Sequence, residues 1–121
     1  MKVRELRKPL VRGHVWRIQY QPWNDPHTTI TKFALILQEG RYFQNYESVC
    51  VVLLTTVAPR RQYRTDVAIP RQDHGQSKDV WAICGQVHTL PVDTLLDYAY
   101  QLSEQTMERI DEALMYGLGL V

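Results

Sequence analysis

The sequence predicts a mainly β fold, a small barrel or sandwich of five or six short strands followed by one C-terminal α-helix. Short strand-length segments recur at regular spacing and are separated by loops rich in turn-forming residues. Only the last segment has apolar residues at helical spacing. The 121 residues, 45% hydrophobic and 22% charged, suit a single globular domain spanning residues 1–121.

The first half of the chain is expected to form three strands. Residues 1–11 are expected to be an irregular arm, because Pro9 disfavours a helix. Residues 14–20 alternate, with four side chains on one face: His14, Trp16, Ile18 and Tyr20. A continuous apolar run predicts a strand over 32–38, and β-branched residues predict a central strand over 48–56.

The second half is expected to add strands and the helix. Alternation predicts strands over 63–70 and 80–87, with a polar loop between them. A single helical turn after Pro91 and a short strand near 97–102 follow. Ser103 is a good N-cap, which predicts a helix over 103–117 that ends at Gly117.

Charge is unevenly distributed although the net charge is only +1. Residues 1–72 contain 12 Lys and Arg against 5 Asp and Glu, whereas residues 73–121 contain 2 against 8. This asymmetry favours a basic surface for a polyanion. The alternative is that the two halves neutralise each other across the fold.

Several features limit the class of protein. No apolar run approaches the length of about 18 residues that a membrane span needs, and the basic N-terminus has no hydrophobic block behind it. We therefore expect a soluble cytoplasmic protein. Cys50 and Cys84 are expected to be buried thiols, since cytosolic disulfides are rare. No cysteine–histidine spacing predicts a metal site. We expect Trp16 and Trp81 in the core, and His27 and His74 on the surface.

Six stretches, taken in order, resemble the MazF/PemK family of toxin endoribonucleases from type II toxin–antitoxin systems. They are RGHVW, TKFALIL, VVLLTT, YRTDVAIP, VWAICGQVHTL and LSEQTMERIDEALMYGLGL, and they extend over residues 12–120. Each stretch is weak alone, but the ordered set with matching spacing is fairly specific for the fold.

The resemblance implies a fold, an activity and partners. It implies a compact SH3-like β-barrel with a C-terminal helix, of the CcdB/Kid/MazF kind, usually a homodimer. It implies sequence-specific cleavage of single-stranded RNA without a metal or another cofactor. It further implies a cognate antitoxin whose disordered C-terminal segment occupies the RNA groove.

Four residues are carried over as catalytic candidates. Lys32 matches a family arginine at the start of the second strand, and Thr55 matches a family threonine at the end of the third. Both would contact the scissile phosphate. His14 and His88 fall where relatives have an acid and an arginine, and imidazoles could divide the acid and base roles. Each residue also has a purely structural interpretation, as a strand-end or surface side chain.

The remaining candidates would bind RNA, because arginines interleaved with aromatic side chains suit phosphates and unstacked bases. Aromatic side chains are equally suited to a small barrel core or a dimer interface. The candidates are Arg12, Trp23, Arg41, Tyr42, Thr56, Arg60, Arg61, Gln86 and Thr89.

The sequence also departs from the family pattern. Ile83 and Gly85 stand where some relatives have an arginine and an aspartate, and Phe33 replaces a proline. The histidines could substitute for the lost pair. The alternative function is a non-catalytic or degenerate toxin-fold module that binds RNA or a protein target, as CcdB-type gyrase poisons do.

Overall fold

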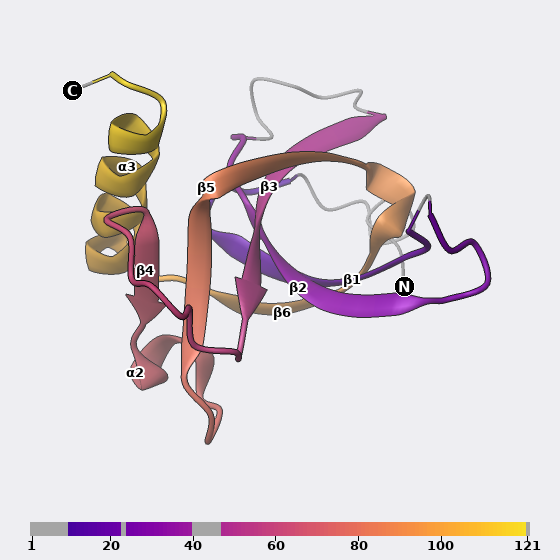
Figure 1. Ribbon diagram of the computed structural model, residues 1–121, viewed down its shortest axis with the longest axis horizontal. Helices are drawn as coiled ribbons and strands as arrows, with labels where there is room; N and C mark the ends of the chain where they lie inside the picture. Colours follow the sequence, from indigo (N-terminus) through magenta and orange to yellow (C-terminus); the bar gives the residue numbers. More distant parts are fainter. Residues whose placement is uncertain (1–9, 23, 40–46, 121) are drawn as a thin grey trace.

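The computed structural model describes residues 10–22, 24–39 and 47–120, which form one antiparallel sheet and a C-terminal helix (Figure 1). The six strands have the spatial order β4-β5-β3-β2-β1-β6. Their bounds are β1 His14–Tyr20, β2 Ile30–Ile36, β3 Ser48–Thr55, β4 Asp66–Ile69, β5 Val80–Pro91 and β6 Leu95–Gln101. The helical elements are α2 Arg71–His74, η2 Val92–Thr94 and α3 Glu104–Gly117.

The sheet carries two buried apolar cores, while parts of β5 and β6 are exposed. Trp16 and Ile18 of β1 pack in a cluster with Ile36 and Val51. Val15, which points the other way, belongs to the larger cluster that includes residues of β4, β5 and α3. Alternating side chains of one strand therefore contribute to two cores, which explains why β2 and β3 are apolar runs rather than alternating ones.

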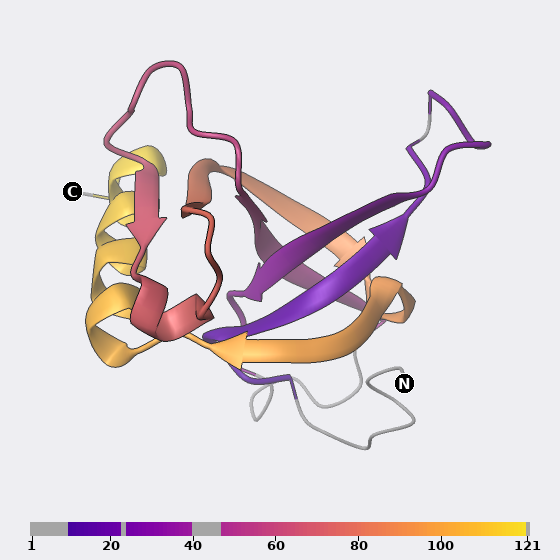
Figure 2. The same cartoon turned by 90° about the horizontal axis from the view of Figure 1, so that it is seen from below.

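Helix α3 covers one face of the sheet beside β4 (Figures 1 and 2). Ser103 caps it, because the serine hydroxyl accepts a hydrogen bond from the Thr106 backbone N–H at 3.2 Å. Asp73 of α2 reinforces this end, accepting from the hydroxyl of Thr106 at 2.7 Å and from that of Ser103 at 3.2 Å. Met107, Ile110 and Ala113 are the buried apolar side of the helix.

Strand β5 bends sharply and allows the sheet to curl (Figure 1). Its first half pairs with β4 and with the end of β3, and its second half pairs with the start of β3. The register shifts between these halves, opposite Val52 and Leu54. The sheet does not close, since in the described part of the chain β4 and β6 remain its edge strands.

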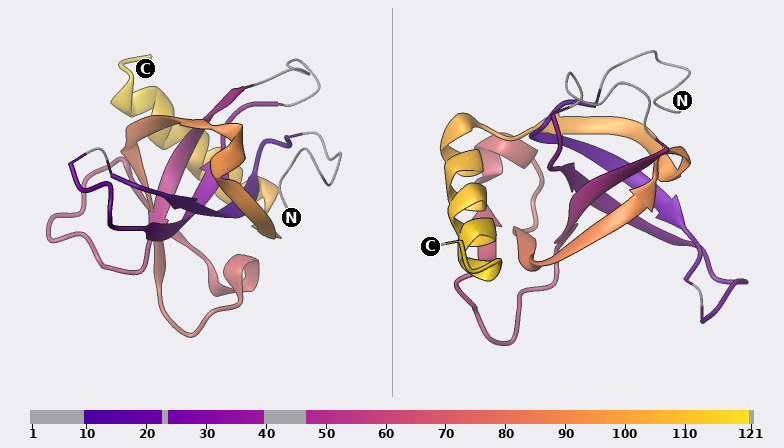
Figure 3. Two further views of the ribbon diagram at one scale, coloured as in Figure 1. Left: turned by 90° about the vertical axis from the view of Figure 1, so that its right-hand side faces the viewer. Right: turned by 90° about the horizontal axis from the view of Figure 1, so that it is seen from above.

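The molecule has two distinct ends (Figure 3). Helix α3 and β4 occupy one end, and the turn between β1 and β2 lies at the other. Among the described residues, no helix is long and apolar enough to cross a membrane.

The predicted mainly β fold with a C-terminal helix is confirmed, and β1 and the Ser103 cap are as expected. Several expectations are wrong. Cys50 and Trp81, which were expected to be buried, are half-buried. Residues 71–74 of the expected polar loop form the short helix α2, and His74 is buried rather than on the surface. Its Nδ1 accepts a hydrogen bond from the Gln76 N–H at 2.9 Å, which holds the ring inside the turn after α2.

Strand β4 is shorter than expected, beginning at Asp66 rather than near Tyr63. The residues before it form a turn that two hydrogen bonds close. The Asp66 N–H donates to the Tyr63 carbonyl, and the Tyr63 N–H donates to the Asp66 carboxylate, both at 2.9 Å. This local bonding competes with the sheet ladder.

Candidate functional site

The register of β2 and β3 places Lys32 and Thr55 just beyond the last paired positions of the two strands. The last paired positions of β2 and β3 are Phe33 and Leu54, so one residue further along the same register Lys32 is opposite Thr55. Lys32 is exposed and Thr55 is half-buried. The antiparallel order therefore brings together two side chains that are 23 positions apart in the sequence.

Thr55 is the last residue of β3, and its hydroxyl oxygen already accepts one hydrogen bond. Its Oγ1 accepts a hydrogen bond from the Val57 N–H at 3.1 Å, and this bond forms the turn that leaves the strand. The hydroxyl proton is still available to donate to an oxygen of a ligand. Thr55 pairs on its other side with Trp81 of β5, which is half-buried.

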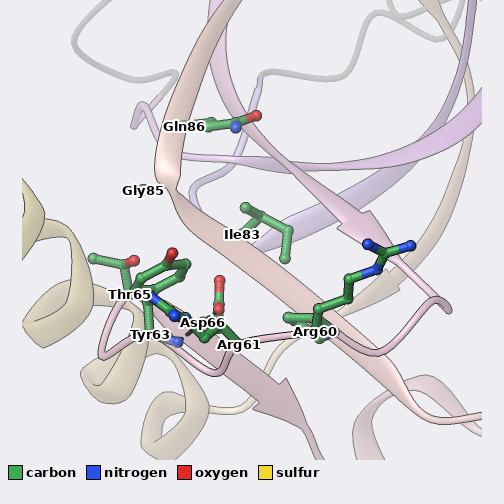
Figure 4. Close-up of a pocket in the computed structure, with 9 residues that line it drawn as sticks. Arg60, Arg61, Tyr63, Thr65, Asp66, Ile83, Gly85 and Gln86 are labelled. Carbon is green, nitrogen blue, oxygen red and sulfur yellow. Dashed lines mark hydrogen bonds between the residues drawn. The ribbon is translucent and has the colours of Figure 1, made fainter.

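A pocket of about 390 Å³ lies between the β3–β4 loop and the bend of β5 (Figure 4). Ile83 of β5 lines it and pairs with Asp66 of β4. Side chains of opposite charge, an aromatic ring and an amide surround it. The lining residues are Pro59, Arg60, Arg61, Tyr63, Thr65, Asp66, Ile83, Gly85 and Gln86.

The wall of this pocket is anchored to both the sheet and the helix. The Cys84 N–H donates to the Thr65 carbonyl at 2.9 Å, which ties the turn before β4 to β5. The guanidinium of Arg64 lies 4.4 Å from the ring centroid of Tyr116 in α3, a cation–π contact. Residues 63–66 are therefore held in place before any ligand arrives.

Gly85 has a structural reason to lack a side chain. A Cβ at this position would lie 3.1 Å from Thr65 Oγ1, closer than ordinary van der Waals contact. Thr65 also approaches Gly117 of α3, where a Cβ would lie 3.1 Å from Thr65 Cγ2. The aspartate that some relatives have at position 85 would therefore displace Thr65.

The pocket keeps its acidic and basic groups apart. Among the described residues, the Asp66 carboxylate makes no ion pair, although Arg60 and Arg61 line the same pocket. Burial, together with the charge of Asp66, raises the pKa of the Cys84 thiol behind the pocket to about 12. Cys84 is thus a protonated, buried thiol and not a nucleophile.

The two histidines lie elsewhere on the sheet. Lys32 pairs with Ile18, four residues along β1 from His14, which corresponds to about 13 Å. His88 is opposite Val51, four residues before Thr55 on β3, again about 13 Å away. The His14 ring packs against Tyr98, with ring centroids 4.9 Å apart. The structure therefore does not bring either histidine next to Lys32 and Thr55.

The other predicted RNA contacts are dispersed. Arg60, Arg61 and Gln86 line the pocket, and Thr56 is exposed just after β3. Arg12 forms an ion pair with Asp111 of α3. Thr89 is exposed opposite Cys50, on the sheet face away from His88. Trp23, Arg41 and Tyr42 lie outside the described residues.

Sequence reasoning missed Asp66 and Thr65 as pocket residues. Asp66 is one of only 5 acidic residues in the basic stretch 1–72, and it follows an aromatic and an arginine. This isolated acidic residue in a basic stretch is the sequence feature that could have identified Asp66 as a site residue. Within the described ranges, no group of three or more His, Cys, Asp or Glu side chains could hold a metal ion.

The fold and the site together define the class of protein. Its members would share a small curled antiparallel sheet, a C-terminal helix and an arginine-lined pocket at one end of the sheet. The family model described as PemK-like, MazF-like toxin of type II toxin–antitoxin system matches residues 11–118. The chain belongs to this family.

Solved structures agree with this assignment. An endoribonuclease from mycobacterial species is 28% identical, with a TM-score of 0.72 and coverage of 93% of each chain. An endoribonuclease in complex with its cognate antitoxin, also mycobacterial, is 28% identical, with a TM-score of 0.74 and coverage of 93% and 97%. A MazE–MazF structure from Deinococcus radiodurans is 16% identical, with a TM-score of 0.77 and coverage of 94% and 99%, a likeness of fold. No curated protein sequence matches the chain.

Proposed function

We propose that this protein is an endoribonuclease toxin that cleaves single-stranded RNA in the cytoplasm at specific sequences and without a metal. The observation that carries the proposal is the register of β2 and β3, which places Lys32 and Thr55 one residue beyond the last pair, Phe33 and Leu54, with the arginine-lined pocket on the far side of β5. A cation and a hydroxyl at adjacent positions suit a phosphate. Family membership and the named activity of the mycobacterial structures support the same activity.

Metal-free cleavage needs few groups. The ribose 2′-oxygen attacks the adjacent phosphorus, the bond to the 5′-oxygen breaks, and a 2′,3′-cyclic phosphate forms. One group accepts the 2′-hydroxyl proton and another gives a proton to the leaving oxygen. Lys32 would stabilise the charge on the phosphate oxygens, and Thr55 would donate a hydrogen bond to one of them.

We assign the acid and base roles to His14 and His88, because an imidazole can either accept or donate a proton. Their distance from Lys32 and Thr55 makes this assignment directly testable. His14→Ala and His88→Ala should each lower the cleavage rate at least about 100-fold if the ring transfers a proton. A loss below threefold for both variants removes them from the reaction.

The deciding experiment uses long mixed-sequence RNA in excess EDTA. We expect reproducible cuts that leave 2′,3′-cyclic phosphate ends, and Thr55→Ala should abolish them. Thr31→Ala is the matched control, because Thr31 is an exposed threonine on the opposite face of β2 from Lys32. An RNA that stays intact at high enzyme concentration would refute the proposed activity.

We also propose two protein partners. A cognate antitoxin would cover the surface around Lys32, Thr55 and the pocket with its C-terminal segment, and the antitoxin complex of the mycobacterial relative supports this partner. Co-expression of that antitoxin should then relieve growth inhibition.

The second partner is another copy of this chain. It would cover the exposed apolar side chains at the end of α3, which include Leu118 and Leu120.

A second candidate function is a non-catalytic module that binds RNA or a protein target, in the manner of CcdB. Ile83 and Gly85 at the expected acid–base positions favour it, as does the distance of both histidines from Thr55. Binding of single-stranded RNA without cutting would support this function, and so would recovery of a topoisomerase with the tagged protein.

A further inference from the structure

The pocket between the β3–β4 loop and the bend of β5 offers hydrogen-bond acceptors and donors together. The Asp66 carboxylate supplies acceptors, and the guanidiniums of Arg60 and Arg61 supply donors. A ligand that were only a phosphate would be repelled by Asp66. A ligand that were only a cation would be repelled by the arginines. The combination suits a nucleotide, which carries a charged phosphate and a neutral base with both donors and acceptors.

Asp66 has a defined orientation and spare bonding capacity. Its Oδ2 accepts one hydrogen bond, from the Tyr63 N–H at 2.9 Å, and this bond fixes the carboxylate within the turn. In the described part of the chain no other hydrogen bond or ion pair of this carboxylate is found, so Oδ1 and a second lone pair of Oδ2 can accept from a ligand.

Tyr63 gives the same turn an exposed aromatic surface. Its side chain is 61% exposed, a large fraction for an aromatic residue next to a pocket. Figure 4 places Tyr63 and Asp66 on one side of Ile83 and Arg60 on the other. A base that stacks on an aromatic ring can present its edge to a neighbouring carboxylate, which is a common mode of recognition for unpaired bases.

Guanine matches these groups better than the other bases. Its Watson–Crick edge carries two adjacent donors, N1–H and the N2 amino group, which a carboxylate can accept together, and its O6 can accept from an arginine. Adenine and cytosine offer an amino donor next to an acceptor nitrogen, and uracil offers a single N–H. The volume of about 390 Å³ accommodates one base with its sugar and lies within the range of small-ligand sites.

The position of the pocket suits a nucleotide that neighbours the cut. Thr55 pairs with Trp81, and Ile83, two residues further, pairs with Asp66. Two strand spacings and two residues separate the Cα atoms of Thr55 and Asp66 by about 12 Å. This separation favours contact with the base of an adjacent nucleotide over contact with the phosphate held at Thr55.

We propose that this pocket binds one guanine base of the RNA strand, with Asp66 accepting from its N1–H and N2 amino group and Tyr63 stacking on its ring. This inference rests on the proposed ribonuclease function and adds a specificity-determining residue to it. The sites cut in RNA would then contain a guanine at one fixed position relative to the scissile bond.

The test starts from the cut sites in mixed-sequence RNA. In a short oligonucleotide containing a preferred site, the fixed guanine is replaced by inosine, which lacks the N2 amino group. The wild-type protein should cut the inosine substrate about tenfold more slowly, because a charge-assisted hydrogen bond is lost. Asp66→Asn should cut the two substrates at equal rates. The amide oxygen of Asn would keep the hydrogen bond from the Tyr63 N–H, and the amide nitrogen cannot accept a hydrogen bond from the guanine N2 amino group. Glu108→Gln, an exposed acid on α3, should discriminate as the wild type does.

Several results would overturn the inference. Cut sites without a fixed guanine would do so, and so would wild-type rates that are equal for guanine and inosine. An Asp66→Asn variant that cuts every sequence more slowly with unchanged base preference would give Asp66 a role in the reaction instead. If no RNA is cut at all, the ribonuclease proposal fails separately. Binding of two single-stranded oligonucleotides of one mixed sequence, with guanine in the first and inosine at the same positions in the second, is then measured by fluorescence anisotropy. Equal affinities would overturn the guanine site, and weaker binding of the inosine strand would support it.

Discussion

The Thr65 side chain lies close to Gly85 of β5 and to Gly117 of α3, and this close approach limits the side chain that position 85 can carry. Gly85→Ala brings a Cβ to 3.1 Å from Thr65 Oγ1, so the variant should lose about 1–3 kcal/mol of unfolding free energy. Thr65→Ala removes the opposing atoms. We therefore expect the double variant to be more stable than the sum of the two single effects predicts, as measured by urea unfolding. Additive effects, within about 0.5 kcal/mol, would show that the contact carries no strain.

The two cysteines should react differently with a thiol reagent. Cys84 is 3% exposed and has a pKa of about 12, whereas Cys50 is half-buried. Only Cys50 should be modified in the native protein near pH 8, and both should react in denaturant. Cys50→Ser should leave the native protein unreactive. Rapid modification of Cys84 in that variant would mean that the core behind the pocket opens readily.

At the scale of elements, an ion pair joins β1 to β6. Arg17 and Asp97 are opposite each other in the register and make two hydrogen bonds of 2.7 Å. The hydrogen bond from Arg17, with its charge, lowers the pKa of Asp97. A carboxylate with a lowered pKa stabilises the folded state above its unfolded pKa of about 3.9, and this stability is lost as the pH falls through the folded pKa.

Asp97→Asn should therefore lower the melting temperature at neutral pH, and the difference from the wild type should shrink below about pH 4. Because both side chains are partly exposed, we expect a small effect that salt weakens. Asp79→Asn is the control, since the pair of Asp79 with Arg71 is longer, at 3.8 Å, and more exposed. A difference that persists unchanged at low pH would assign the effect to packing rather than to charge.

Elements were predictable where local pattern and tertiary context agree. The alternation of residues 14–20 and the Ser103 cap predict β1 and the start of α3 without further information. Helix α2 was not predictable, because it depends on bonds to residues distant in the sequence. Asp73 of α2 accepts from Ser103 and Thr106, 30 and 33 positions later, and no local pattern reveals these partners. The start of β4 was missed because the local turn between Tyr63 and Asp66 overrides the alternating pattern.

At the scale of the whole molecule, strand order decides which predicted residues meet. The adjacency of Lys32 and Thr55 follows from pairing two consecutive strands, which the resemblance to a family already implied. His14 and His88 lie at motif positions too, but the register places them about four residues away from that pair. The pocket was not predictable, because its lining comes from the β3–β4 loop, β4 and a bend of β5.

The exposed end of α3 leads to a prediction for the assembled protein. Four large apolar side chains within six residues are exposed there: Met115, Tyr116, Leu118 and Leu120, with Leu118 64% and Leu120 67% exposed. Such a patch on a small protein marks an interaction surface. If a second copy covers it, replacing both Leu118 and Leu120 by Ser should convert the dimer to a monomer in light scattering coupled to size exclusion.

The experiment requires that the double variant stays folded as a monomer. Because Leu118 and Leu120 are exposed, their loss should change the stability of the monomer by less than about 0.5 kcal/mol, so the variant stays folded. Val57→Ser, which removes an apolar side chain that is 75% exposed but is far from α3 in the sequence, should remain dimeric. The melting temperature of the wild type should rise with protein concentration, and that of the double variant should not. A double variant that elutes as the wild type does would place the dimer interface on another surface of the sheet.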